Sequence, residues 1–423
     1  MITPQPHPPF DTDVLVVGAG PTGLALATTL RRAGHEPLVV ERLAEGQGTS
    51  RAAVIHAHTL EVLESLGIGE RLLREGIQLS RFSIRDRDET LVHLRFDRLP
   101  SDHACLLMVT QDRTEHVLRE ALAEARGRVQ WGTTVKSIVA SGGGVTAALE
   151  TREGTRMVRA RYVVGADGMH SLVRTAADIG FTGSTYEESF VLADVEMDWP
   201  PGRDEVMLFF SPPGLVVVAP LAHGRFRVVA TMQDAPLRPG VADVQRLLDE
   251  RGPQSARSRV TAVHWSSRFR LHHRVADHYR SGPFLLVGDA AHVHSPAGGQ
   301  GMNTGLVDAC VLGRMLAEVL DGRQPDEWLD RYEALRRPAA QQVLGLAGRL
   351  TAMATTKGAA RRWVRNLMLR TIGKLPPARR KLEMGLSGLA RRDAARLPDG
   401  QITLSRNIMP AWHRSAHPAL PQR

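Results

Sequence analysis

The sequence predicts an α/β fold in which a mainly parallel sheet is interrupted by a mostly antiparallel sheet and followed by a basic helical segment. Apolar runs leading to glycines and acids occur around residues 14–41, 162–168 and 284–303, which is typical of strands that end at a ligand-binding edge. Residues 181–274 consist of short alternating segments, with one helical stretch at about 241–251, and indicate antiparallel strands. Residues 129–131, 135–140 and 145–150 are predicted to form a small β-meander. Residues 349–396 hold 13 Lys and Arg against two acids. A chain of 423 residues is long enough for two or three such units.

The first of these stretches is the most informative, because it reads as one βαβ unit. The β-branched run Val14–Val17 suits a buried strand, and Gly18, Gly20 and Gly23 follow at the G-x-G-x-x-G spacing. That spacing allows a tight turn, the approach of a pyrophosphate to the backbone, and close packing of helix on strand. A helix from about Pro21 to Arg32 would point its first amides at the phosphate. The unit therefore predicts a dinucleotide site.

The residues after this helix narrow the choice of nucleotide. A second strand, residues 37–40, ends on Glu41, whose carboxylate can accept hydrogen bonds from the two hydroxyls of an unphosphorylated ribose. Glu41 therefore favours FAD or NAD over NADP as the bound nucleotide. Arg51 lies in the loop beyond, where it could reach the phosphates or be a solvated loop charge, and the spacing leaves both open.

The two later stretches also bring acids to the predicted ligand edge. Asp167 follows a buried strand in a Gly-Ala-Asp-Gly sequence, which is compatible with an ordinary turn as well as with a ligand contact. Asp289 ends another strand, before a glycine-rich loop and a helix over about 301–320. An acid beside a helix N-terminus suits a reduced flavin, which has sugar-chain hydroxyls and a negative pyrimidine end. For His292 and His294 we expect packing or hydrogen-bonding roles, since no triad or metal-ligand spacing accompanies them.

Composition excludes several other classes of protein. Cys105 and Cys310 are the only cysteines, so a disulfide framework and a four-cysteine zinc site are both excluded, and a reducing cytoplasm is expected. No run of 18 apolar residues occurs, which argues against a membrane span. Most of the net charge of +9 lies in the C-terminal segment, and no nucleic-acid-binding motif accompanies it.

The basic segment contains an amphipathic pattern. Residues 359–375 place Trp363, Leu367 and Leu375 at helical spacing among arginines. We predict that this helix covers the body with its apolar face and solvates its arginines. Binding to a membrane surface, an acidic carrier protein or a neighbouring subunit is the alternative.

Taken together, the motifs GAGPTG (18–23), GADG (165–168) and GDAAHVHSPAGGQGMN (288–303) resemble those of the FAD-dependent aromatic monooxygenases. This group A flavoprotein family includes p-hydroxybenzoate hydroxylase and phenol hydroxylase, and the resemblance covers roughly residues 12–345. It implies a Rossmann-like FAD-binding domain, NADPH or NADH as co-substrate, and O2. The implied reaction is hydroxylation of an aromatic or polycyclic compound, such as a phenol or polyketide, through a flavin hydroperoxide.

The resemblance also implies site residues. The implied FAD contacts are Gly18, Gly20, Pro21, Thr22, Gly23, Glu41, Arg42, Arg51, Gln111, Asp167, Gly168, Asp289, Pro296, Gly301, Met302 and Asn303. Pro296 and Gly298 belong to the loop expected against the flavin ring, and no catalytic acid or base can be identified. Candidate substrate-lining residues are Met207, Phe209, Val217 and Pro220, because they lie on strands expected to face the flavin.

The predicted domain organisation follows the three stretches. The FAD-binding domain comprises residues 1–75, 103–180 and 275–345, the substrate domain 76–102 and 181–274, and the C-terminal basic helical segment 346–423. An FAD-dependent reductase or a Baeyer–Villiger oxygenase of an isoprenoid, quinone or polyketide substrate is the alternative function. A non-catalytic flavin-binding or carrier-docking protein is the third. We expect no nucleic-acid partner, and a homodimer is left open.

Overall fold

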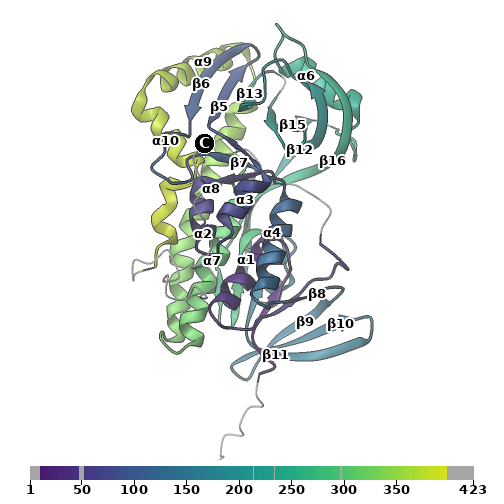
Figure 1. Cartoon of the computed structure of the whole chain (residues 1–423), viewed down its shortest axis with the longest axis vertical. Helices are drawn as coiled ribbons and strands as arrows, with labels where there is room; N and C mark the ends of the chain where they lie inside the picture. The colour runs from purple at the N-terminus through teal and green to yellow at the C-terminus, as the bar shows by residue number, and fades with distance from the viewer. Residues whose placement is uncertain (1–9, 47–51, 213, 233, 296–297, 398–423) are drawn as a thin grey trace, which may run out of the picture.

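The computed structural model describes residues 10–46, 52–212, 214–232, 234–295 and 298–397, without the side chains of 185–188, 270 and 271. Arg51 and Pro296 lie outside the described residues. The described chain has two large sheets placed one above the other in Figure 1, with long helices running along one flank.

The lower sheet is the predicted parallel sheet. Its strands are ordered β17-β18-β11-β1-β2-β8, and β18, β11, β1, β2 and β8 run parallel. Their bounds are β1 Thr12–Val17, β2 Leu38–Val40, β8 Val129–Gln130, β11 Gly154–Gly165, β17 Arg280–Ser281 and β18 Phe284–Leu286. Because the strands are parallel, their carboxyl ends meet at one edge, followed by Gly18, Glu41, Asp167 and Asp289. The prediction that these residues share one edge of the sheet therefore agrees with the structure, and ligand binding at this edge stays a prediction.

Helices cover this sheet and bury its apolar strands. α1 (Pro21–Arg32) has the predicted bounds, and Leu24, Ala27 and Leu30 are fully buried on it. It packs on α7 (Gly301–Leu320), where a Cβ at Gly313 would lie 2.7 Å from the Thr29 side chain. The other helices of this part are α2 Ala57–Glu64, α3 Gly69–Glu75, α4 Gln111–Glu124, α5 Leu172–Ala176 and the 3-10 turn η1 Gly288–Ala290.

One strand of the predicted β-meander belongs elsewhere. We expected residues 129–131 to start a meander, but β8 pairs in parallel with β2, with Val40 opposite Gln130. The meander instead consists of β9 (Thr134–Ser141), β10 (Gly144–Thr151) and the first half of β11. A two-residue strand is defined by its distant partner, so its local sequence does not reveal its sheet.

The upper sheet is mostly antiparallel, as predicted, in the order β19-β16-β12-β15-β14-β13-β5-β6. Its strands are β5 Arg81–Asp86, β6 Glu89–Arg95, β12 Phe181–Asp198, β13 Glu205–Phe209, β14 Val216–Pro220, β15 Phe226–Met232, β16 Arg259–Ala276 and β19 His292–Val293. A small sheet of β3 (Val54–His56), β7 (Leu106–Met108) and β4 (Ile77–Leu79) lies between the large ones. The predicted domain boundaries stay a prediction.

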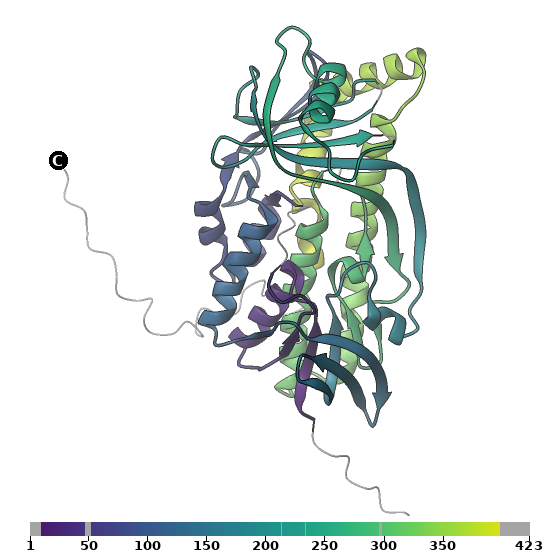
Figure 2. The ribbon, with the colours of Figure 1, turned by 90° about the vertical axis from the view of Figure 1, so that its right-hand side faces the viewer.

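Strands β12 and β16 join the two parts of the molecule. Each has 18 residues, and they pair with each other from Phe181 opposite Ala276 to Asp198 opposite Arg259. One end of this ribbon also pairs with β19, next to η1 and the parallel sheet. Figure 2 shows the two strands descending side by side from the upper sheet.

The upper sheet is buried on both faces. One face packs under α6 (Val241–Arg251), through Val244, Leu247 and Leu248. The other face packs toward the nucleotide-binding part and the C-terminal helices, where Leu350 and Leu386 join the same apolar cluster. We call these the α6 face and the inner face.

The described part of the predicted C-terminal segment, residues 346–397, is mainly helical, as predicted. Its helices are the end of α8 (Asp330–Ala354), which begins before the predicted boundary and follows η2 (Asp326–Leu329), then α9 Ala359–Lys374, α10 Pro376–Leu386 and η3 Leu389–Ala395. α8 runs along the parallel sheet, and α9 crosses the edge strand β6 at the top of Figure 1. Within the described part of the chain, no helix is both long and apolar enough to cross a membrane.

The predicted orientation of α9 is wrong. Trp363 and Leu367, which we expected to be buried, have 64% and 45% of their surface exposed, whereas Arg365 is 5% exposed. The Arg365 guanidinium is satisfied by backbone, because it donates to the carbonyls of Phe210 (2.8 Å) and Met353 (3.0 Å). These acceptors come from distant parts of the chain, so the local amphipathic pattern could not indicate which side faces the body.

Candidate active site

The glycine turn between β1 and α1 has the geometry that phosphate binding needs. Gly18 has φ +101°, and a Cβ there would lie 2.4 Å from the Ala166 carbonyl oxygen. A Cβ at Gly23 would lie 1.9 Å from the Gly18 oxygen, so both glycines are required by packing. A Cβ at Gly20 would meet nothing within 4 Å. Gly20, the N-cap of α1, therefore leaves open space at the helix N-terminus, where an anion is favoured.

Glu41 is held directly beside this turn. Its Oε2 accepts from the Ala19 N–H (2.9 Å) and its Oε1 from the Leu43 N–H (3.1 Å). These contacts fix a buried carboxylate at the carboxyl end of β2, as the motif requires. The side chain of the neighbouring Arg42 is exposed.

Asp167 has a structural role at the end of β11. Its Oδ2 accepts from the N–H groups of Leu172 (2.7 Å) and Val173 (3.2 Å), at the start of α5. Oδ1 is buried without a hydrogen-bond partner among the described residues, and burial raises the pKa of this carboxyl group. The following Gly168 has φ +78°, which explains the glycine of the Asp-Gly pair. Asp167 therefore at least fixes the turn at the ligand edge.

Asp289 lies at the carboxyl end of β18 with its side chain exposed. The turn that presents it is tightly packed, because a Cβ at Gly288 (φ +59°) would lie 2.8 Å from Thr22 Oγ1. A Cβ at Gly305, on α7, would also lie 2.6 Å from Thr22 Oγ1. Thr22 thus joins three predicted elements of the site: the glycine turn, the Asp289 turn and α7.

Gln111 connects the loop before β3 to helix α4. Its backbone N–H donates to the Ala52 carbonyl (3.0 Å), and its Oε1 accepts from the Ala52 N–H (3.3 Å). The same Ala52 carbonyl accepts from Arg227 Nη1 (2.8 Å), on β15 of the upper sheet. Arg227 is held by a two-bond ion pair with Asp194, both bonds 2.7 Å long. Gln111 therefore lies where the upper sheet contacts the nucleotide-binding part.

The glycine-rich loop before α7 is fixed by Asn303. Its Oδ1 accepts from the His56 N–H (2.8 Å), and its Nδ2 donates to the carbonyls of Val54 and Gly299 (both 2.9 Å). A Cβ at Gly299 would lie 2.2 Å from Val54. Asn303 thus binds the loop to strand β3, and its predicted place beside the loop agrees with the structure.

The C-terminal segment closes over this loop. Gln300 donates to the Leu386 carbonyl (2.7 Å) and accepts from Arg391 (2.8 Å). His56 Nε2 lies 2.9 Å from the Gly298 carbonyl, and burial lowers the pKa of His56 to about 4, so its ring is neutral at pH 7. No local pattern in the sequence indicates a site role for His56 or for Arg391, which lies 88 residues after Asn303, the last residue of the motif.

His292 is part of a buried charge cluster behind the loop. Its Nε2 lies 2.6 Å from one oxygen of Asp308, whose other oxygen accepts from Arg336 Nε (2.7 Å). All three side chains are buried. Although burial alone would raise it, the charges of Arg336 and His292 lower the pKa of Asp308. The expected hydrogen-bonding role of His292 is confirmed. His294 Nδ1 lies 2.8 Å from the Ser295 carbonyl, and burial lowers the pKa of His294 to about 4.

Comparison with known proteins identifies the family. Residues 11–347 match the FAD binding domain family. The chain is 33% identical over 342 residues to the pentachlorophenol 4-monooxygenase of Sphingobium chlorophenolicum, covering 79% of this chain and 63% of that enzyme. It is 34% identical over 391 residues to the 6-methylpretetramide 4-monooxygenase of Streptomyces rimosus, covering 89% and 69%. The solved structure of the anhydrotetracycline hydroxylase OxyS from Streptomyces rimosus matches with a TM-score of 0.75 and 35% identity, over 89% of this chain and 76% of that one.

The chain belongs to the FAD-dependent aromatic monooxygenase family. The predicted family and fold class are therefore confirmed. The chain spans about two thirds of the length of the two curated relatives. Both faces of the upper sheet are apolar, so the face that points toward the nucleotide-binding part decides which of its residues could line a substrate site.

Three of the four predicted substrate-lining residues lie on the α6 face of that sheet, away from the nucleotide-binding part. Met207 and Phe209 are 1% and 0% exposed and belong to the α6 face. Val217 is half-buried on the inner face, and strand alternation puts Pro220 with the α6 face. The prediction failed because both faces are apolar, so alternation of polar and apolar residues could not distinguish them. Val229 and Phe269 are the further half-buried apolar residues of the inner face.

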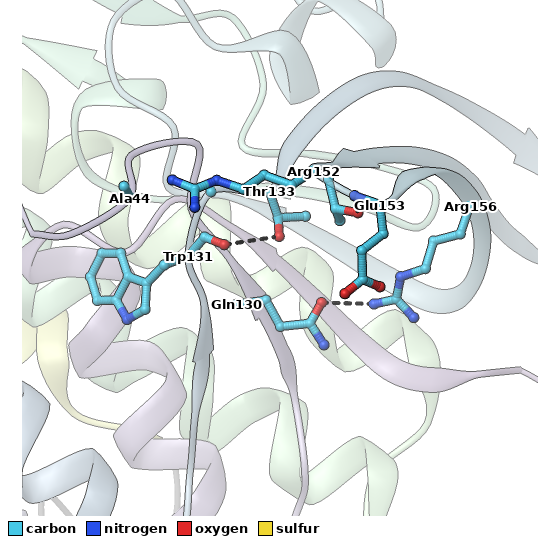
Figure 3. Close-up of a pocket in the computed structure, with 9 residues that line it drawn as sticks. Ala44, Gln130, Trp131, Thr133, Arg152, Glu153 and Arg156 are labelled. Atoms are coloured by element: carbon cyan, nitrogen blue, oxygen red, sulfur yellow. Dashed lines mark hydrogen bonds between the residues drawn. The ribbon is translucent and has the colours of Figure 1, made fainter.

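A separate hollow of about 590 Å³ lies beside β8 and the β10–β11 hairpin. Figure 3 shows that Arg152, Glu153 and Arg156 line it from the hairpin, with Gln130 and Trp131 from β8 and its end. Arg156 donates to Gln130 across it (2.7 Å). None of the predicted cofactor or substrate residues lines this hollow, so we do not assign it to the active site. Among the described residues, no group of His, Cys, Asp and Glu has the arrangement of a metal site.

Proposed function

We propose that the chain is an FAD-dependent monooxygenase that uses NAD(P)H and O2 to hydroxylate an aromatic or polycyclic small molecule. The observation that carries the proposal is the contact of Arg227 and Gln111 with one carbonyl, that of Ala52. It joins the dinucleotide-binding part to the inner face of the upper sheet. The proposed cofactor site and the apolar surface proposed for the substrate therefore lie next to each other. The names of two relatives, a pentachlorophenol 4-monooxygenase and a 6-methylpretetramide 4-monooxygenase, support the same substrate class.

The residues at the ligand edge fit FAD. Gly20 leaves room for a pyrophosphate at the N-terminus of α1, and Glu41 supplies an acceptor for ribose hydroxyls. Asp289 supplies an exposed carboxylate at the neighbouring strand end for the sugar chain. The first amides of α7, at Gly301 and Met302, favour negative charge on the ring system. When bound, FAD would supply the redox chemistry, taking electrons from NAD(P)H and transferring one oxygen atom from O2.

The protein would supply positioning and exclusion of water. Asn303 and Gln300 hold residues 298–300 of the glycine-rich loop against β3 and the C-terminal segment, so this part of the surface offered to the ring is fixed by hydrogen bonds. Val217 and Val229, opposite each other on β14 and β15, provide an apolar surface on the inner face. A preorganised, apolar site protects reactive species from water.

The test combines spectroscopy with isotope labelling. The purified protein should carry FAD, oxidise NADPH or NADH faster when a suitable phenol or polycyclic compound is present, and incorporate ¹⁸O from ¹⁸O2 into the product. Absence of bound FAD after reconstitution would refute the cofactor. Substrate reduction without label would instead identify a reductase, and labelled insertion into a ring ketone would identify a Baeyer–Villiger oxygenase.

A matched pair of variants tests the assigned face. Val217 lies on the inner face and Val218 on the α6 face of the same strand. Val217→Ala should change KM or substrate preference, because a methylene in an apolar pocket changes discrimination by about 10-fold. Val218→Ala should lower stability while leaving KM unchanged. The opposite result would place the substrate on the α6 face.

A further inference from the structure

Helix α9 carries an exposed apolar stripe that the proposed function does not use. Trp363, Val364, Leu367, Met368 and Leu375 at its end are 44–64% exposed. The other large apolar side chains that are exposed in the described part of the chain belong to elements other than α9: Phe10, Val139, Met157, Leu237 and Val241. Large apolar side chains gathered on one surface mark an interaction site.

The helix cannot rotate to bury this stripe, because its opposite side is anchored. Leu369 is 2% exposed and belongs to the inner-face cluster. Arg365 donates to two buried backbone carbonyls, and Asn366 donates to Asp86 (2.7 Å). A Cβ at Gly373 would lie 3.0 Å from the Leu91 carbonyl, so the helix backbone lies directly on β6. The exposed side is therefore fixed toward solvent.

Basic side chains border the stripe. At about 100° per residue, the apolar side chains occupy a sector about 140° wide. Arg370 lies at one edge of this sector and Arg361 at the other, while Lys374 lies inside it near Trp363, and all three are exposed. Arg370 is paired with Glu89 of β6 (2.6 Å), and α9 itself contains no Asp or Glu. An apolar sector bordered by cations is typical of helices that lie in a membrane interface, where long basic side chains reach the headgroups.

We propose that α9 docks the protein on an anionic phospholipid surface, with Trp363 and Leu367 in the interface and Arg361 and Lys374 at the headgroups. The charge pattern disfavours a second copy, because a two-fold contact would place α9 cations against the same cations. The helix lies at the outer end of the molecule in Figures 1 and 2, so it can meet a flat surface. The inference does not depend on the proposed function.

The test is vesicle co-sedimentation of the full chain. We expect binding to vesicles of phosphatidylglycerol and phosphatidylcholine that weakens with salt, and at least about tenfold weaker binding to phosphatidylcholine alone. Trp363→Ser/Leu367→Ser should reduce binding to the anionic vesicles at least about tenfold, and Arg361→Gln/Lys374→Gln should also reduce the salt dependence. Leu237→Ser is the matched control, since Leu237 is an exposed apolar residue outside α9 (71% exposed), and it should bind like the parent.

Several results would overturn the proposal. Absence of binding to anionic vesicles would do so, as would equal binding by Trp363→Ser/Leu367→Ser and the parent. A dimer seen by light scattering that this double variant abolishes would assign the stripe to a second copy. If the parent and Trp363→Ser/Leu367→Ser bind vesicles equally, but only the parent binds an acidic protein, the stripe is a docking site for such a protein.

Discussion

Replacing Gly20 and Gly23 separately by alanine distinguishes cofactor binding from folding at the glycine turn. A Cβ at Gly23 would lie 1.9 Å from the Gly18 carbonyl oxygen, so the backbone of the turn or the helix must shift by more than about 1 Å. Overpacking of this kind costs about 3 kcal/mol of unfolding free energy. At Gly20 the added methyl meets nothing within 4 Å, and the cost is that of changing an N-cap residue, about 0.5 kcal/mol.

The two variants should differ in the opposite order in FAD binding: Gly20→Ala, which costs little stability, should lose FAD affinity. In Gly20→Ala the methyl fills the space assigned to the pyrophosphate, and we expect the FAD affinity to fall at least about tenfold, or about 1.4 kcal/mol. Urea unfolding of the apoprotein measures the loss of stability, and FAD titration by flavin fluorescence measures the loss of FAD affinity. If Gly20→Ala binds FAD like the parent, the phosphate assignment is wrong. If Gly23→Ala is as stable as the parent, the steric argument is wrong.

Three further predictions concern buried and half-buried ionisable groups. Asp308→Ala should lower the unfolding free energy by about 3–5 kcal/mol, because it leaves the buried Arg336 guanidinium unpaired, and a loss below 1 kcal/mol in urea unfolding would contradict this. Burial alone would raise the pKa of Glu61, but hydrogen bonds from His58, Arg392 and Ser101 lower it to about 2 from 4.5. Glu61 therefore stabilises the fold above pH 4.5, and this contribution to the unfolding free energy, about 1–2 kcal/mol, is lost as the pH falls toward 2. In Glu61→Gln this part of the pH dependence of the unfolding free energy should be absent. Burial raises the pKa of both cysteine thiols to about 11, so neither should react with a thiol reagent at pH 8 until the protein is unfolded.

The fold could be predicted where local sequence decides the structure. The helices α1, α6 and α7 have the predicted bounds, since each combines an apolar period with a glycine or proline at its start. Strand β8 was misplaced because its two residues pair with β2, 90 residues earlier. The face of α9 was misplaced because Arg365 donates to the carbonyls of Phe210, just after β13, and Met353, on α8, which no pattern within the helix indicates.

The motif residues of the candidate site could be predicted from the sequence, but the residues that hold them in place could not. Gly18, Gly20, Gly23, Glu41 and Asp289 all meet at one edge, as their spacing indicates. The supports come from distant elements: Arg227 reaches the loop before β3 from the upper sheet, and Arg391 reaches Gln300 from the C-terminal segment. A single arginine among fifty carries no signal in the sequence.

The ribbon of β12 and β16 has a consequence for how the protein moves. A paired strand of 18 residues is about 60 Å long, and both of its strands are built into the upper sheet at one end and run to the nucleotide-binding part at the other. Two hydrogen-bonded strands resist bending far better than a single peptide linker does. The ladder is most irregular between Thr185 and Ser189, where three residues of β12 lie opposite one residue of β16. Any bending of the ribbon is therefore expected at this bulge, and the paired stretches on either side of it should move as rigid units.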